Sequence, residues 1–308
     1  MSHHSRLPPA VDQAVRSFIR RYKHGLRWGC LAAVPLALAL LAVAAWGLYR
    51  GVIRVKDSVK DAVTGSLPAI RVPLEWERPL GDSALAQLRG QYPFVTNRQV
   101  LDPLDRLAAP LFEVPSNGAD RFTLFVTESK EVNAFALPGG IIVFHRGLLQ
   151  RARTAQEIQG VLAHEMAHVR KRHGVLQLAQ SLGMGLALQQ LQGSSGGMLE
   201  TLIRDSGQLL SLKFSRDHER AADDLGWELL NQARINPQGM VDFFAGLKAE
   251  ADAAPTTPIP LLSTHPAPQE RIDRLNQKPA VPGPADFRSF AQEFMDLQAG
   301  LGLTAEKP

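Results

Sequence analysis

The segment HEMAH, residues 164–168, constrains this chain more than any other stretch. His164 and His168 stand four residues apart, so on a helix of 3.6 residues per turn both imidazole rings leave the same face. That spacing suits a single tetrahedral zinc ion. Glu165 projects about 100° round the helix from His164, so its carboxylate misses the metal and can reach a water molecule at the metal's open position.

This spacing indicates a metal site only if the segment is helical. The flanking residues predict a helix over residues 154–173. Thr154 and Glu157 form a capping-box pair at its start, and basic residues stand at its end, where they suit the helix dipole. One side is apolar, formed by Ile158, Val161, Leu162 and Ala163. A chance match to this motif occurs in on the order of one chain of this length in a hundred, so a surface helix with two solvated histidines stays open until a third ligand is found.

A hydrolytic zinc site with two histidines needs a third protein ligand and one open position. In the metzincin pattern a glycine and a histidine follow the second histidine by three and six residues, but Lys171 and Gly174 occupy those positions. The other pattern is a glutamate on a later helix with an acidic residue four positions on. Residues 215–226, SRDHERAADDLG, supply Glu219 and Asp223. We therefore predict Glu219 as the third ligand and Asp223 as the acceptor for the free ring N–H of a ligand histidine.

His218 is a competing ligand in the same segment. It points about 100° away from Glu219 on a helix, so we expect it to face solvent or pack locally. Taken alone, the segment is equally typical of a charged surface helix, but the motif upstream favours a metal site. The prediction is one Zn²⁺ per chain.

Composition excludes several other classes of protein. With 308 residues, 45% hydrophobic and 21% charged, the chain can bury one or two substantial cores. A net charge of +4 with dispersed Lys and Arg argues against nucleic-acid binding. Cys30 is the single cysteine and lies in an apolar run, which excludes an intrachain disulfide and disfavours a thiol enzyme.

The N-terminal part of the sequence predicts a membrane anchor. Residues 1–27 are basic and amphipathic, as in a helix on an anionic membrane surface. Residues 28–49 carry no charge and, at about 1.5 Å per residue, can cross a hydrocarbon core of about 30 Å. A cleaved signal peptide is the rival interpretation, but the long charged segment before the apolar run favours a retained transmembrane helix. More Lys and Arg precede the span than closely follow it, which predicts a cytoplasmic N-terminus.

Residues 50–71 are predicted to be a juxtamembrane linker, residues 72–278 a folded domain, and residues 279–308 a C-terminal linker and helix. The predicted fold class is α+β, predominantly helical, with a small β-sheet that precedes the predicted zinc-binding helix at residues 154–173. Residues 174–199 are charge-free and rich in Leu and Gln; they suit a helix that touches lipid or covers the site. The other predicted elements are helices at 83–91, 98–111, 199–212, 215–232, 237–250, 269–276 and 286–297, strands at 121–126, 131–137 and 141–144, and a proline-rich loop at 255–268.

Four ordered motifs resemble those of the membrane-associated gluzincin metallopeptidases. This family includes the HtpX heat-shock proteases, the CAAX prenyl endopeptidases and the periplasmic beta-barrel assembly-enhancing proteases. The motifs are NAFALPGG (133–140), HEMAH (164–168), SRDHERAAD (215–223) and STHPAPQERI (263–272). The resemblance implies a zincin-like (gluzincin) metallopeptidase domain. The single predicted span is more similar to the single-anchor members, although no tetratricopeptide repeats follow Asn276.

The resemblance also implies roles for residues outside the metal motifs. Asn133, Ala134, Phe135 and Ala136 would bind an extended substrate along a sheet edge. His265 would either stabilise the oxyanion or occupy zinc's fourth position as a removable plug. Arg271 would steady that loop or the oxyanion beside the substrate. His24, His145 and His173 belong to no motif, so we expect them to be structural or solvated.

These observations predict a zinc endopeptidase in which His164, His168 and Glu219 hold the metal and Glu165 is the general base. The resemblance implies misfolded or misassembled envelope and membrane proteins as substrates. The charge-free run and the Lys/Arg bias predict an inner-membrane anchor that contacts lipid through residues 28–49 and a periplasmic catalytic domain. A zinc-stabilised chaperone is the rival from another class, but a purely structural site needs no general base. A prenyl-protein protease needs a membrane chamber that a single span does not provide.

Overall fold

The computed structural model describes residues 72–115, 121–191, 193, 195–266, 269–279 and 286–303, together with Gln13 and Ser17. The chain divides into two compact units, Met1–Leu67 and Pro68–Pro308, and every helix and strand given below belongs to the second. The predicted basic segment, membrane span and linker lie outside the described residues, apart from Gln13 and Ser17. Within the described ranges, none of the helices has the length and apolar character needed to cross a membrane.

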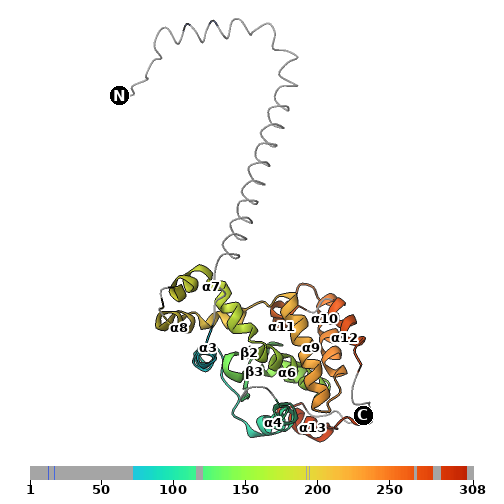
Figure 1. Ribbon diagram of the computed structural model, residues 1–308. Coiled ribbons are helices and arrows are strands. Elements are labelled where there is room, and N and C mark those ends of the chain that lie inside the picture. The colour runs from blue at the N-terminus through green and yellow to red at the C-terminus, as the bar shows by residue number, and fades with distance from the viewer. Residues whose placement is uncertain are drawn as a thin grey trace, which may run out of the picture. The chain divides into compact units, whose positions relative to one another are not determined.

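The described part of the second unit is predominantly helical, with a small mixed sheet beside the central helix (Figure 1). This agrees with the fold class predicted for the domain. The α-helices are α3 (Glu77–Gln91), α4 (Arg98–Phe112), α5 (Arg146–Arg151), α6 (Ala155–Arg170), α7 (His173–Leu191), α8 (Ser195–Arg204), α9 (Arg216–Gln232), α10 (Gln238–Ala253), α11 (Pro260–Thr264), α12 (Gln269–Asn276) and α13 (Ala291–Gly300). Short 3-10 helices span Leu74–Trp76, Pro138–Gly140 and Ser206–Ser211.

The sheet contains three strands, β1 (Thr123–Thr127), β2 (Ala134–Leu137) and β3 (Ile141–His145), in the order β1-β3-β2. β3 lies in the middle, parallel to β1 and antiparallel to β2, and all five of its residues are buried. Gly139 and Gly140, at φ 73° and 82°, turn the chain between β2 and β3. A Cβ on Gly140 would lie 2.2 Å from the carbonyl oxygen of Arg121, so only glycine fits this close turn.

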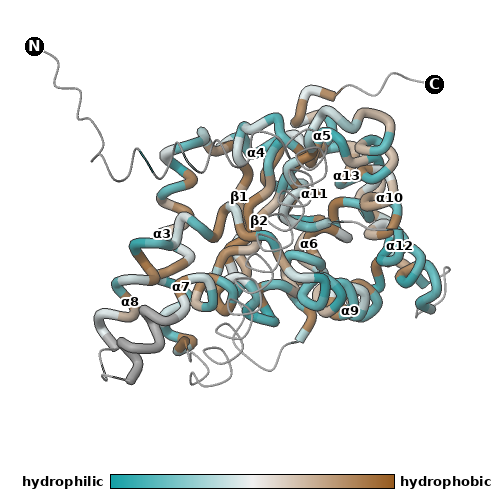
Figure 2. Tube along the Cα trace, turned by 90° about the horizontal axis from the view of Figure 1, so that it is seen from above, coloured by the Kyte–Doolittle hydropathy of each residue, from teal (hydrophilic) through white to brown (hydrophobic). Residues whose placement is uncertain are grey.

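α6 is the buried centre of the domain and lies between β2 and α9 (Figure 2). Its approach to α10 depends on Gly160, where a Cβ would lie 2.5 Å from the Cα of Met240. The main hydrophobic core surrounds α6 and joins it to α4, α9, α10 and α13, whereas a second cluster packs α3, α7 and α8 against the sheet. Because α6 is covered on nearly every side, the side chains of its second half are held in fixed positions.

Several predicted boundaries are wrong, and tertiary contacts explain them. α3 begins at Glu77 rather than residue 83, since Pro79 lies in the first helical turn, where its missing N–H needs no partner. The helix predicted at 199–212 ends at Arg204, because Ser206 is buried and hydrogen-bonds to Ser83 and Gln87 of α3. The proline-rich loop contains α11, α5 was not predicted, and α13 begins at Ala291 instead of residue 286.

Candidate metal centre

α6 (Ala155–Arg170) begins where the sequence predicts but ends three residues before the predicted end at residue 173, because Arg172 adopts φ 59°. The HEMAH segment lies wholly within the helix, as predicted. The Thr154 hydroxyl accepts a hydrogen bond from the Glu157 backbone N–H at 3.2 Å. The Glu157 carboxylate accepts one from the backbone N–H of Arg153, one residue before the position that a capping box requires. His164, Glu165 and His168 are each only 1% exposed, so these polar side chains lie in the interior.

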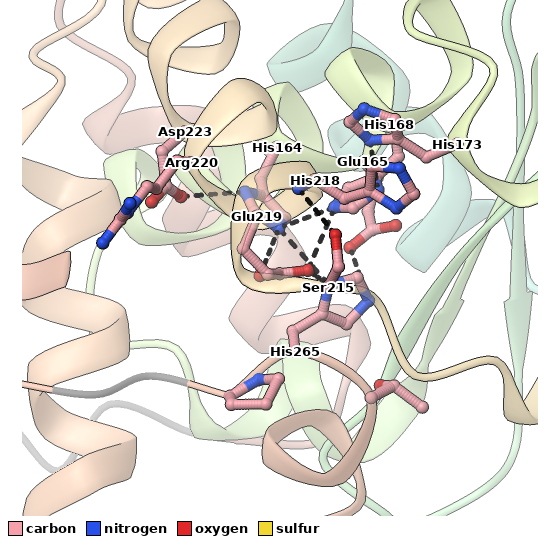
Figure 3. Close-up of polar contacts among 12 residues, drawn as sticks. His164, Glu165, His168, His173, Ser215, His218, Glu219, Arg220, Asp223 and His265 are labelled. Atoms are coloured by element: carbon pink, nitrogen blue, oxygen red, sulfur yellow. Dashed lines mark hydrogen bonds and ion pairs between the residues drawn. The ribbon is translucent and has the colours of Figure 1, made fainter. Parts of the chain in front are cut away.

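Three side chains from two helices converge in this interior (Figure 3). The Nε2 atoms of His164 and His168 are 3.1 Å apart. The Glu219 carboxylate comes from the first turn of α9, with Oε2 3.5 Å from His164 Nε2 and Oε1 3.4 Å from His168 Nε2. The structure therefore brings together the three residues predicted to hold zinc, although α6 and α9 are far apart in sequence.

His265 joins this group as a fourth potential donor. Its Nδ1 lies 3.0 Å from Glu219 Oε1 and 3.3 Å from His164 Nε2, and its ring is 2% exposed. The potential ligand atoms of the four residues all lie within 4.8 Å of one another. His265 caps the end of α11, and a hydrogen bond from Phe214 N–H to the Thr264 carbonyl ties this segment to the residues before α9.

The donor set fits zinc. Two imidazoles and one carboxylate are ligands that zinc prefers, and ligand atoms about 2.0–2.1 Å from a tetrahedral zinc lie about 3.3 Å from one another. The three distances among His164, His168 and Glu219 run from 3.1 to 3.5 Å. A metal-free cluster of this kind would bury several polar groups without full hydrogen bonding, which is unfavourable unless a cation is bound.

Burial and mutual contact set the ionisation of these groups. Burial raises the pKa of the Glu165 carboxyl, although His265, whose Nε2 lies 3.7 Å from Glu165 Oε1, and the Ala136 backbone act to lower it. Burial also acts to raise the pKa of Glu219, but contact with His265, His164 and His168 outweighs it and holds that pKa well below its ordinary value. Burial holds the pKa of His168 well below 6.5. These directions favour an ionised Glu219 and a neutral His168, the forms in which these two side chains bind a metal, whereas the raised pKa of His164 means that this ring must release a proton when a metal binds.

Asp223 lies one helical turn beyond Glu219 and faces His164. Its Oδ1 is 3.2 Å from His164 Nδ1, although the ring N–H is poorly aligned for a linear hydrogen bond. Burial alone would lower the pKa of His164, but contact with Asp223 and Glu219 outweighs it and raises the pKa to about 9. Asp223 thus lies where the sequence predicts an acceptor for a ligand histidine.

Arg271 connects the carboxylates of Glu219 and Asp223. Its guanidinium donates to both oxygens of Asp223, at 2.7 and 2.9 Å, and to Glu219 at 2.5 Å. It also donates to the backbone carbonyl of Pro266, next to His265. Arg271 is 4% exposed. Its bond to Pro266 agrees with the expectation that it steadies the loop, whereas its contacts with Glu219 and Asp223 were not predicted.

The predicted substrate-binding residues form an edge of the sheet. The Asn133 carbonyl accepts a hydrogen bond from His145 N–H, and because bonded and non-bonded pairs alternate in an antiparallel ladder, Ala134 and Ala136 direct their N–H and C=O groups away from β3. The Asn133 side chain already accepts the Ala134 N–H at 3.0 Å. The Ala136 backbone faces Glu165. Phe135 is an interior residue, only 9% exposed, and packs edge-on against His145.

We expected His173 to be structural or solvated, and the structure shows it buried, but its contact with the ligand His168 was not predicted. The backbone of Arg172 has φ 59°, and this left-handed turn folds the chain back, so that His173 Nδ1 lies 3.1 Å from Nδ1 of His168. His218 packs locally, as expected, with its ring stacked on His173 at 4.3 Å. The periodicity of α6 could not predict the contact between His173 and His168, because His173 comes after the end of that helix.

A cavity of about 390 Å³ opens beside Glu219. Phe214, which forms part of its wall, also packs against the ring of His168 with 4.1 Å between centroids. Because Glu219 itself lines the cavity, the cavity is next to the predicted metal ligands. Its lining consists of Lys213, Phe214, Ser215, Arg216, Glu219, Arg220, Pro266, Glu270 and Arg271.

Comparison with known proteins agrees with this geometry. Residues 95–278 match Peptidase family M48. The beta-barrel assembly-enhancing protease of Escherichia coli (strain K12) is 27% identical over 237 residues, which cover 72% of this chain and 48% of that protein. Metalloprotease LoiP of the same organism is 29% identical over 160 residues, 50% of this chain and 62% of LoiP. The chain spans about half the length of the beta-barrel assembly-enhancing proteases that it matches.

Proposed function

The chain belongs to peptidase family M48, and from this premise we propose that it is a zinc-dependent endopeptidase. One observation carries the proposal: three buried donors with zinc-like spacing lie beside a further buried acidic side chain, the Glu165 carboxyl, which the donor set does not need as a ligand. A structural zinc site has no use for such a group, whereas peptide hydrolysis requires a base.

His164, His168 and Glu219 would hold the ion, and Asp223 would keep the ring of His164 in place. When bound, zinc supplies a Lewis acid that polarises the scissile carbonyl and makes water more acidic. Glu165 accepts the proton of the attacking water and returns it to the leaving amine. Its raised pKa suits the first of these transfers, because a carboxylate whose pKa lies nearer to neutral is a stronger base toward the water proton.

Ala136 supports the way in which a substrate would bind. Its N–H and C=O point away from β3 and toward the side on which Glu165 lies. An extended peptide that pairs with this edge is held by main-chain hydrogen bonds, so its sequence matters little. Such binding suits unfolded chains. Asn133, Ala134 and Phe135 shape this edge, since their own side chains are buried beneath it.

We propose that His265 is the removable plug rather than an oxyanion donor. Its Nδ1 lies as close to Glu219 and His164 as the three predicted ligands lie to one another, which puts it in the fourth donor position. A substrate carbonyl would need that position. The loop of Pro266, held by Arg271, would therefore have to move before peptide hydrolysis begins.

Misassembled envelope proteins are the substrates that we propose, on the basis of relatives named beta-barrel assembly-enhancing protease. Residues 28–49 would anchor the chain in the inner membrane and contact lipid, with residues 50–308 in the periplasm. The arrangement would bring the site close to newly exported chains. A reporter fused to the C-terminus and active on only one side of the membrane tests the orientation.

Digestion of casein with and without a zinc chelator tests the activity. A peptidase should cleave casein, lose activity when zinc is removed and regain it when zinc is restored. A zinc-stabilised chaperone, the rival function, would bind unfolded casein but leave it intact under every condition. Absence of cleavage both by the zinc-loaded wild type and by zinc-loaded His265→Ala, in which the plug is gone, would contradict the proposal.

A further inference from the structure

The two ligand imidazoles have different partners on their outward nitrogens. His164 Nδ1 faces a carboxylate, Asp223, at 3.2 Å, whereas His168 Nδ1 faces another imidazole nitrogen, Nδ1 of His173, at 3.1 Å (Figure 3). A ligand histidine in proteins almost always donates its second ring N–H to an acceptor, and the acceptor fixes its tautomer and orientation. His168 has His173 in that place.

We propose that His173 is a positioning residue for the metal: its Nδ1 accepts a hydrogen bond from His168 and thereby keeps His168 Nε2 directed at zinc. The proposal rests on the zinc site of the proposed function. A hydrogen bond between two ring nitrogens needs one proton, and Nε2 of His168 must be unprotonated to bind a metal. The proton therefore lies on His168 Nδ1, and His173 carries its own proton on Nε2.

The surroundings of His173 hold its ring in the orientation that this bond requires. The residue is 5% exposed, and the ring of His218 stacks on it with centroids 4.3 Å apart and planes inclined by 19°. His218 in turn contacts Gln177 Oε1 at 3.3 Å, and the Gln177 amide donates to the backbone carbonyl of Lys213.

His173 and Gln177 are four residues apart on α7, so they leave the same face of the helix. The first turn of α7 thus contacts His168 on the zinc helix through His173. The next turn contacts the segment before α9 through Gln177, which donates to the backbone carbonyl of Lys213. This arrangement fixes the distance between the acceptor on His173 and the ligand, which a side chain on a mobile loop would not do.

Two substitutions separate the hydrogen bond from packing. His173→Phe keeps a ring for His168 and His218 to contact but has no acceptor. His173→Asn loses the ring but places an amide oxygen close to the position of Nδ1. The measurement is zinc affinity of the full chain, by competition with a chromogenic chelator, which needs no peptidase activity. We expect about 10- to 100-fold weaker zinc binding for His173→Phe and near wild-type binding for His173→Asn.

His218→Phe is the matched control, because it keeps the stacked ring and leaves the His168–His173 contact intact; zinc affinity should change little. Equal affinity for wild type and His173→Phe would overturn the proposal, as would a larger loss in His173→Asn than in His173→Phe, since packing would then explain the effect. Nitrogen-15 NMR of the zinc-loaded wild type is a second measurement that needs no variant. It should show His173 protonated at Nε2, and a proton on Nδ1 would overturn the proposal.

These results are distinguishable from a failure of the proposed function. Tight zinc binding without casein cleavage would contradict the peptidase and leave the role of His173 standing. Casein cleavage by the wild type together with unchanged zinc affinity in His173→Phe would contradict the role of His173 and leave the peptidase function standing.

Discussion

Nδ1 of His265 lies 3.0 Å from Oε1 of Glu219, so a residue from the loop after α11 closes a site whose other donors come from α6 and α9. The contact joins residues 46 positions apart in sequence. It leaves the candidate metal centre with four donors, although hydrolysis needs one position for substrate or water. The first prediction follows from this conflict.

Replacement of His265 by Ala should increase the rate of casein cleavage, because it removes a donor that competes with substrate. If the open form of the wild type is populated at about 10% or less, the gain should be about tenfold or more. Zinc content should stay at one ion per chain, since three ligands remain. A fall in rate with normal zinc content would show instead that His265 assists the reaction, as an oxyanion donor would.

Replacement of Glu165 by Gln should leave zinc bound and reduce cleavage by about 100-fold or more, which is the usual contribution of a general base. Glutamine has nearly the same shape but cannot accept a proton from water. Metal content by elemental analysis and casein turnover, measured on the same sample, give both quantities. Unchanged turnover would remove Glu165 from the mechanism.

Replacement of Arg271 by Ala should destabilise the chelator-treated protein by about 3–5 kcal/mol, because two buried carboxylates, Glu219 and Asp223, would lose their cation. Denaturant unfolding measures the difference. Arg98→Ala is the matched control: Arg98 pairs with Asp102 on an exposed helix face, its side chain is 78% exposed, and its loss should cost no more than about 1 kcal/mol. Similar effects of the two substitutions would contradict a structural role for Arg271.

Acid should destabilise the domain through His145. Burial lowers the pKa of His145 from 6.5 to about 4. The carboxylate that faces the ring, Glu131 with Oε2 3.6 Å from Nδ1, is half exposed and does not offset this effect, and neither ring nitrogen has a hydrogen-bond partner among the described residues. The unfolded chain therefore takes up a proton that the folded chain does not, so this contribution to stability is complete above pH 6.5 and is lost as the pH falls from 6.5 toward 4.

His145→Phe tests the effect, since it keeps an aromatic ring beside Tyr92 and Phe135 but cannot ionise. The free energy of unfolding, measured by denaturant at several pH values, should fall less steeply in the variant below pH 6.5. The difference in slope should not exceed about 1.4 kcal/mol per pH unit for one proton. Identical slopes for variant and wild type would contradict the prediction.

The helix that carries His164, Glu165 and His168 could be predicted from sequence because its information is local. A cap at Thr154, a periodic apolar side and a four-residue spacing all act within a few turns of chain, and each has a known geometric meaning. The roles of Glu219 and Asp223 could be predicted from sequence for the same reason. Their spacing on one helix, together with the ligand count of zinc, identifies them before any fold is known.

Tertiary structure alone decided how these segments meet. α6 lies against α9 and α10 because Gly160 and Gly226 allow backbones to approach closely, and spacing within a helix does not encode that approach. Arg271 donates a hydrogen bond to Asp223, which is 48 residues away in the sequence. His173 reaches His168 only because Arg172 adopts φ 59° after the helix ends.

The sequence by itself thus determined which residues share a helical face, since that depends on the fixed periodicity of hydrogen-bonded backbone. It also determined the chemistry that those residues can perform. Only the tertiary structure decided which faces meet, how His265 and His173 complete the surroundings of the three predicted ligands, and which charges are buried together. Those outcomes depend on the packing of segments distant in sequence, which no local pattern specifies.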